Sequence, residues 1–233
     1  MKKRVSRKLR AGAGRRKGSQ PAGRKTRGSG AGKTGGRRRT ATVHRKTGET
    51  DIRIALAIEG RGRVRVTTGL GFFDHMMTAL ALHGGMDLDV KASGDLHVDQ
   101  HHLVEDCGIA LGQALRKALG DRKGIERTGF FVFPMEESLA TAAIDLGGRP
   151  ALVVRARFRR VRVGDLETDM IPEFLRGLTR GLMADLHVVL PYGWNDHHKA
   201  EAIFKAVGKA LKLAMSRDGR YHDLVLSTKG MLE

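Results

Sequence analysis

The chain has 233 residues, of which 40% are hydrophobic, and a formal net charge of +18. This size allows a substantial buried core without disulfides, and the single cysteine, Cys107, excludes both an internal disulfide and a C-x-x-C metal or redox motif. No apolar run approaches the roughly 18 residues of a membrane span and the N-terminus lacks the apolar segment of a secretory signal, so we expect a cytoplasmic protein without membrane contact.

Positive charge is concentrated in residues 1–40, which hold sixteen of the 43 lysines and arginines and no acidic residue. This segment is rich in glycine and has no aromatic residue, so we expect a disordered tail that contacts polyanions nonspecifically. A targeting role stays open, although few serines and weak amphipathicity argue against it. The stretch "GSGAGKTGG" (28–36) resembles a phosphate-binding P-loop, but Arg27 occupies the position of the motif's first glycine and no strand precedes it.

From residue 41 onward, strand-like and helix-like periods alternate. The first series predicts two strands that form a hairpin around a Gly-rich turn, then a helix, a strand and a long helix, at 50–60, 62–69, 72–85, 86–93 and 101–119. The second series predicts three strands, a helix opened by Pro172, a strand and a long helix, at 129–135, 139–148, 151–159, 171–183, 185–193 and 197–215.

The two series match each other, with "MDLDV" and "DQHHLVE" in the first corresponding to "ADLHV" and "NDHHKAE" in the second. We therefore predict an internal duplication and an α+β fold. Each half, about 41–125 and 126–233, should form a mainly antiparallel four-stranded sheet with two helices packed on one face. Together the halves should make one catalytic domain, 41–233.

Each half contains two adjacent histidines followed by a glutamate, at His101, His102 and Glu105 and at His197, His198 and Glu201. Residues three and four apart share a helix face, so both imidazoles should reach the carboxylate. Imidazole and carboxylate ligands without thiolate suit manganese, iron or zinc. A single copy fits a capped helix start equally well, with Asp99 or Asn195 as the cap, but two equivalent copies favour a metal site.

Further residues suggest additional metal ligands and an anion site. His75 and His187 fall at the ends of a predicted helix and strand and are candidates to complete the metal coordination. Arginine, lysine, serine and a glycine turn are suited to a phosphate monoester. Such residues occur at Arg127, Arg149, Lys205 and the C-terminal "STKG" (227–230), although each alone is more often a surface group.

Eight blocks of the sequence resemble, in order, those of the imidazoleglycerol-phosphate dehydratase family of histidine biosynthesis. They are "HRKTGETDI", "TGLGFFDHM", "ALHGGMDLDV", "GDLHVDQHHLVEDCGIALGQAL", "PMEESLA", "DLGGRP", "NDHHKAEAIFKA" and "STKG". The resemblance runs from about residue 39 to the C-terminus and does not cover the tail. It implies a hydro-lyase that removes water from imidazole glycerol phosphate to give imidazole acetol phosphate, with two Mn²⁺ ions per active site and a homo-oligomer of 24 subunits.

The resemblance also implies roles for individual residues. Metal ligands would be His75, His101, His102, Glu105, His187, His197, His198 and Glu201, and all of these except His187 would also line the substrate site. Further substrate contacts would be Glu49, His83, Arg127, Arg149, Lys205, Ser227 and Lys229. Glu49 is our candidate for proton transfer and Glu201 the second candidate. Gln100, where the family usually has aspartate, departs from the pattern without removing a proposed ligand.

Two other functions were weighed against this one. A dinuclear metal hydrolase acting on a phosphate ester would also use His, Glu and Arg, but no Asp-rich metal motif occurs. A nucleic-acid-binding module carried by the basic tail is a weaker alternative, because the rest of the chain is nearly neutral and has only two tyrosines and one tryptophan.

Overall fold

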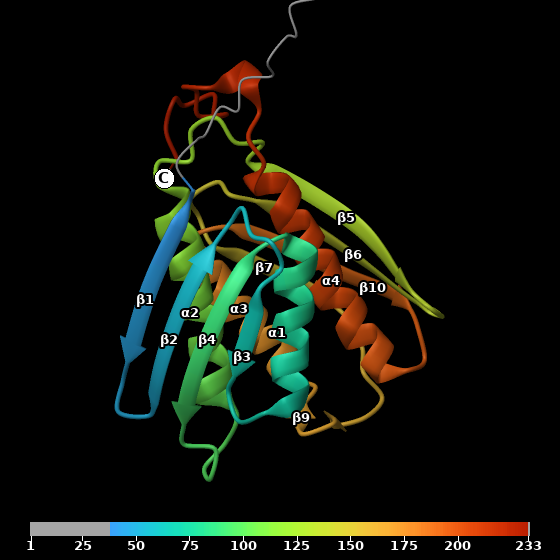
Figure 1. The fold of residues 1–233 in the computed structure, drawn as a ribbon. Helices are drawn as coiled ribbons and strands as arrows, with labels where there is room; N and C mark the ends of the chain where they lie inside the picture. The colour runs from blue at the N-terminus through green and yellow to red at the C-terminus, as the bar shows by residue number, and fades with distance from the viewer. Residues whose placement is uncertain (1–37, 233) are drawn as a thin grey trace, which may run out of the picture. The chain divides into compact units, whose positions relative to one another are not determined.

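The structure is a computed structural model that describes residues 38–232, in which two four-stranded sheets lie on either side of four helices (Figure 1). In the first sheet the strand order is β1-β2-β4-β3, and only the β3–β4 pair is parallel. The elements of this half are β1 (Thr40–Lys46), β2 (Thr50–Ala57), β3 (Val64–Thr67), α1 (Gly71–Gly84), β4 (Asp87–Gly94) and α2 (His101–Leu119).

The second half repeats this plan. Its strand order is β5-β6-β10-β7, and only the β7–β10 pair is parallel. Its elements are β5 (Thr128–Met135), β6 (Ser138–Asp145), β7 (Ala151–Arg155), β8 (Arg162–Val163), β9 (Leu166–Glu167), α3 (Met170–Leu182), β10 (Asp185–Tyr192), α4 (Asp196–Met215) and the 3₁₀ turn η1 (Gly219–Tyr221). The strand order and the strand pairing are the same in both halves, which confirms the predicted duplicated α+β fold.

The helical layer contains the core shared by the two halves. Helix α2 packs on β1 and β2 and against α3, while α4 packs on β5 and β6 and against α1. Three fully buried rings meet in this layer: Phe174 lies 5.4 Å from Phe73 and 5.2 Å from Phe204, measured between ring centroids. Because these rings come from α1, α3 and α4, neither half could bury its apolar face alone.

Helices α2 and α3 approach so closely that side chains are excluded from the contact. A Cβ atom on Gly112 would lie 2.4 Å from the carbonyl oxygen of Leu178, and one on Gly181 would lie 2.2 Å from that of Ile109. Because backbone atoms cannot move aside as a flexible side chain can, only glycine fits at these positions.

The predicted hairpin between residues 50–60 and 62–69 is wrong, because β4 lies between β2 and β3 and pairs with both. The first residues of β4 hold the connecting loop in place. One carboxylate oxygen of Asp87 accepts hydrogen bonds from the backbone N–H groups of Arg61 (2.6 Å) and Arg63 (3.0 Å). This loop therefore crosses the end of β4 instead of reversing directly.

The remaining differences from the predicted elements are small. Strand β1, the true hairpin partner of β2, was not predicted, because this edge strand buries only Ala41 fully and has no clear apolar alternation. The short β8–β9 hairpin was also missed, and α3 begins at Met170, before Pro172. Most of the predicted tail lies outside the described residues. Within residues 38–232 no helix is both long and apolar enough to cross a membrane.

Candidate active site

The first turns of α1 and α4 bring together His75, His197 and Glu201. His75 Nε2 lies 3.7 Å from one carboxylate oxygen of Glu201, and His197 Nε2 lies 3.4 Å from the other. One potential ligand atom from each of the three residues lies within 4.8 Å of the others. The two imidazoles are about half exposed whereas Glu201 is buried, so the open side of this cluster faces outward. This geometry is compatible with a divalent metal ion.

Local structure fixes these side chains. Asn195 caps α4 by accepting a hydrogen bond from the backbone N–H of His197 (3.0 Å). The ring of Phe72, at the start of α1, packs edge-on against His197 with 5.0 Å between ring centroids. Burial would raise the pKa of Glu201, but the Lys205 ammonium at 2.8 Å, together with the neighbouring histidines, outweighs this effect and the pKa is lowered. Glu201 is therefore held as a carboxylate.

The first histidine pair, at the start of α2, has different surroundings. Asp99 accepts from the backbone N–H of His101 (2.9 Å), and the His101 ring lies 3.7 Å from Glu105. The ring of His102 instead contacts Asp95 through Nδ1 (3.0 Å) and lies 3.6 Å from Glu49 through Nε2. The Asp95 hydrogen bond raises the pKa of His102. Asn195 is thus confirmed as the cap of α4, whereas α2 begins after Gln100, and Asp99 lies one residue before the cap position.

The two histidines of each pair do not converge on the following glutamate, contrary to our expectation. In α4, His197 faces Glu201, whereas His198 Nδ1 contacts Glu137 at 2.7 Å. Consecutive helical residues are separated by about 100° around the axis, so adjacent side chains diverge. Each pair therefore presents its imidazoles in two directions.

Two predicted site residues lie apart from these clusters. His187 is exposed on β10, on the sheet face opposite the helices, because Leu186 and Val188 on either side of it are buried. His83, near the end of α1, packs edge-on against Phe133 with 5.1 Å between ring centroids. Burial first, and then the charge of Lys205, lower the pKa of His83.

A pocket of about 150 Å³ brings together four of the residues predicted to bind phosphate. They are Arg127, Arg149, Ser227 and Lys229. Arg127 is fixed by two contacts with Asp145, at 2.7 and 2.8 Å, and by donation to the carbonyl of Leu226. Three basic side chains, a hydroxyl and the turn 227–230 suit this pocket to a small anion.

The phosphate pocket and the α1–α4 histidine cluster lie at opposite ends of α4. The backbone N–H of Arg127 donates to the carbonyl of Ala214, in the last turn of the helix, whereas Glu201 lies near its start. At about 1.5 Å per residue, the distance along the helix between these points is about 20 Å.

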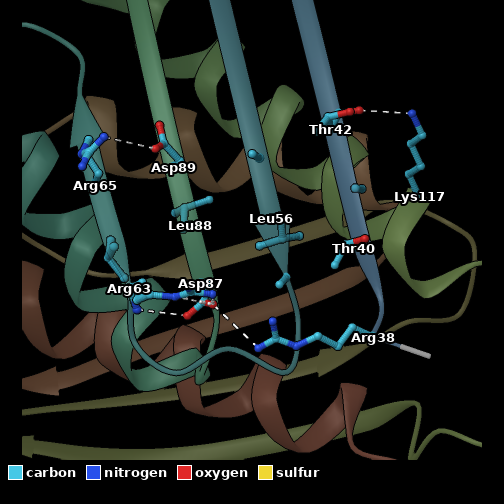
Figure 2. A pocket seen from close by; sticks show the side chains of 14 residues that line it. Arg38, Thr40, Thr42, Leu56, Arg63, Arg65, Asp87, Leu88, Asp89 and Lys117 are labelled. Atoms are coloured by element: carbon cyan, nitrogen blue, oxygen red, sulfur yellow. Dashed lines mark hydrogen bonds and ion pairs between the residues drawn. The ribbon is translucent and has the colours of Figure 1, made fainter. Parts of the chain in front are cut away.

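A large cavity, of about 830 Å³, lies elsewhere, on the outer face of the first sheet (Figure 2). Its charged residues are paired with neighbours: Asp87 with Arg63 and Arg38, and Asp89 with Arg65. None of the described residues that line it belongs to the predicted site. Its size alone therefore does not make it a candidate active site.

Sequence reasoning missed two acidic residues that contact the histidine pairs. Asp95 follows β4, and Glu137 lies in the turn between β5 and β6. The position of Glu137 directly before a strand, within "PMEESLA", matches that of Glu49 within "KTGETDI" and was a usable signal. Asp95 has no counterpart in the second half, where Gly193 follows β10 in the same way.

Comparisons with known proteins place the chain in one family. The family model for imidazoleglycerol-phosphate dehydratase matches residues 68–211. Proteins of that name from Gluconobacter oxydans (strain 621H) and Koribacter versatilis (strain Ellin345) are 50% and 47% identical over 194 residues, which cover 83% of this chain and 98% and 100% of those proteins. The crystal structure of IGPD from Pyrococcus furiosus in complex with (S)-C348 is similar, with a TM-score of 0.72, 36% identity and coverage of 82% of this chain and 100% of that chain. The imidazoleglycerol-phosphate dehydratase of Staphylococcus aureus subsp. aureus N315 gives a TM-score of 0.70, 34% identity and coverage of 77% and 99%.

Proposed function

The chain belongs to the imidazoleglycerol-phosphate dehydratase family of histidine biosynthesis, hydro-lyases by reaction class, and we propose that it dehydrates imidazole glycerol phosphate in a metal-dependent reaction. The observation that carries the metal dependence is the convergence of His75, His197 and Glu201, with ligand atoms within 4.8 Å of one another. Two imidazoles and a carboxylate without a thiolate fit Mn²⁺, and we propose two such ions per active site. We also propose a cytoplasmic location, as expected from the sequence.

The active site requires more than one copy of the chain. The substrate has an imidazole ring joined to a phosphate by a three-carbon chain. This is much shorter than the roughly 20 Å along α4 from Glu201 to Ala214, the residue that the backbone of Arg127 contacts. Within one chain it cannot contact both the histidine cluster and the phosphate pocket. We infer that the cluster of one copy faces the pocket of another, in a closed homo-oligomer of 24 subunits. His187, exposed on the outer face, is then available to a neighbouring copy.

The residues divide the chemistry among them. Bound metal would act as a Lewis acid toward the substrate imidazole, which must accept negative charge because no carbonyl lies beside the reacting carbon. Glu49 is exposed and points toward His102, so it can take the proton from this carbon. Glu201 is buried and paired with Lys205, which suits a ligand better than a base. Arg127, Arg149, Ser227 and Lys229 would bind the phosphate.

The proposal is tested by removing and restoring metal. We expect dehydration of imidazole glycerol phosphate to stop in excess chelator and to be restored best by Mn²⁺, with at least one metal ion bound per chain by elemental analysis. Full activity in chelator would contradict the metal dependence. Release of inorganic phosphate without dehydration would instead indicate the hydrolase alternative.

A further inference from the structure

In both halves, the second histidine of the pair is hydrogen-bonded through Nδ1 to a carboxylate. His102 contacts Asp95 at 3.0 Å and His198 contacts Glu137 at 2.7 Å. An ionised carboxylate only accepts hydrogen bonds, so the hydrogen of a neutral ring lies on Nδ1 and the lone pair on Nε2. An imidazole in this tautomer is ready to bind a metal through Nε2.

Glu137 is firmly held in this role. Its Oε1 accepts hydrogen bonds from the backbone N–H groups of Asn195 (2.8 Å) and Trp194 (3.2 Å) and is hydrogen-bonded to the hydroxyl of Ser138 (2.9 Å). Its Oε2 contacts His198, and the side chain is only 11% exposed. Glu137 thus connects the β5–β6 turn to the start of α4 and fixes the orientation of the His198 ring.

The equivalent residue of the first half, Glu49, is not held in this way. It also directly precedes the second strand of its half, but it is 53% exposed and lies near Nε2 of His102 instead of Nδ1. The Nδ1 contact of His102 is made by Asp95, which follows β4. One half therefore uses its turn glutamate to orient a histidine, whereas the other uses a different residue.

We propose that Asp95 and Glu137 are positioning residues that fix the rings of His102 and His198 so that Nε2 keeps the lone pair with which it can bind a metal. Because Asp95 orients His102, Glu49 is left available for proton transfer. This inference rests on the proposed function, since it assigns a purpose to the Nε2 atoms. It also explains why Glu49 and Glu137, which occupy matching positions in the two halves, have different surroundings.

A competing interpretation is that Glu136, Glu137 and His198 form a cation site of their own, because their ligand atoms lie within 4.8 Å of one another. Both oxygens of Glu137 are already engaged in hydrogen bonds, however, and Glu136 is 72% exposed with its nearer oxygen 3.8 Å from His198 Nδ1. These contacts favour orientation of the ring over binding of an ion between the three groups.

The test compares Mn²⁺ binding by the metal-stripped full-length protein and its Glu137→Gln and Asp95→Ala variants, by electron paramagnetic resonance of free Mn²⁺. In Glu137→Gln the three donors to Oε1 should retain the amide oxygen, so the NH₂ group faces Nδ1 of His198 and cannot accept its hydrogen. Asp95→Ala removes the acceptor of His102 altogether, which an asparagine would not do because its amide oxygen could still accept. Both rings should therefore lose the Nδ1–H tautomer, and Mn²⁺ affinity should fall about 10- to 100-fold. The two variants should weaken different sites, and ¹⁵N spectra of the metal-free protein should show the hydrogen moving from Nδ1 to Nε2. Asp121→Asn, which changes an exposed carboxylate paired with Lys123, is the matched control.

The outcomes separate the inference from the function it rests on. If the parent binds Mn²⁺ and both Glu137→Gln and Asp95→Ala bind it as tightly as Asp121→Asn, the positioning role alone is overturned. Equal weakening by Glu136→Gln and Glu137→Gln would overturn it in favour of the three-residue cation site. A parent protein that binds no Mn²⁺ would contradict the proposed function itself. Thermal unfolding of the metal-free variants verifies that each is folded.

Discussion

Glu49 and Glu201 both lie beside histidines, but their environments give them different chemistry. Glu201 is buried, its pKa is lowered, and it contacts Lys205 at 2.8 Å. Glu49 is about half exposed, and its carboxylate lies 3.6 Å from Nε2 of His102. A general base needs access to the substrate proton, a requirement that the exposed carboxylate of Glu49 meets better than the buried carboxylate of Glu201.

We therefore expect Glu49→Gln to reduce turnover by about a hundredfold or more, the usual effect of losing a general base. Metal content, oligomer size and substrate affinity should be preserved, because the amide has the same size. Steady-state kinetics together with elemental analysis check this. Turnover within about twofold of the parent, the range of ordinary surface substitutions, would transfer the role to another carboxylate.

The pH dependence of metal binding follows from His102 and His198. Hydrogen bonds to Asp95 and Glu137 raise the pKa values of these imidazoles, and the contact with His198 lowers the pKa of Glu137 to about 2. Only neutral imidazole binds metal. As the pH is lowered, Mn²⁺ affinity should therefore begin to fall while the pH is still above about 6.5, the ordinary histidine pKa.

Without metal, the same groups should have the opposite effect on stability. A raised folded-state pKa adds stability below the unfolded-state value, and this stability is lost as the pH rises through the folded-state value. The metal-free protein should therefore lose this contribution as the pH rises above the ordinary histidine pKa of about 6.5, while Mn²⁺ binding strengthens. Thermal unfolding with and without Mn²⁺ over this range measures both trends, and parallel trends would contradict the assignment.

At the residue scale, the sequence predicted what depends on local spacing. The cap of α4 by Asn195 and the proximity of His197 to Glu201 both join residues that are close together in the sequence. The contact of His198 with Glu137 joins residues 61 positions apart, so no local pattern could predict it.

Among the elements, the spacing of apolar residues predicted where the helices lie, but it did not predict the order of the strands in each sheet. Alternating side chains identify a strand but not its neighbour, so β3 was paired with β2 when the structure inserts β4 between them. The close approach of α2 and α3 was equally invisible, although Gly108, Gly112, Gly177 and Gly181 recur four residues apart in both helices. Such spacing indicates a close helix contact only once the partner helix is known.

This contact predicts that Gly181→Ala is destabilising. The new Cβ would lie 2.2 Å from the carbonyl oxygen of Ile109, so α2 and α3 must separate, at a cost of about 1–3 kcal/mol in the free energy of unfolding. Denaturant unfolding of the metal-free protein measures this change. Gly219→Ala, where no atom lies within 4 Å of the added Cβ, is the control and should match the parent. Equal stability of the two variants would contradict the close packing.

In the molecule as a whole, the duplicated fold places its functional groups at separate ends. The histidine cluster of α1 and α4 lies near the start of α4, whereas Arg127, Arg149 and Ser227 lie beside the end of that helix. The sequence predicted the members of both sites because their motifs are local. It could not show that one chain holds them too far apart for one small substrate, since that depends on the length and direction of α4.

The most direct test of a shared active site is dehydration activity after co-assembly of two inactive variants, His75→Ala and Arg149→Ala. His75→Ala removes part of the histidine cluster and Arg149→Ala part of the phosphate pocket, so each alone should be inactive. If cluster and pocket come from different copies, about a quarter of the sites in a random 1:1 assembly receive both intact parts, and about a quarter of the parental activity should return. If one chain supplies both, every site keeps a defect, and a mixed assembly without activity would contradict the account.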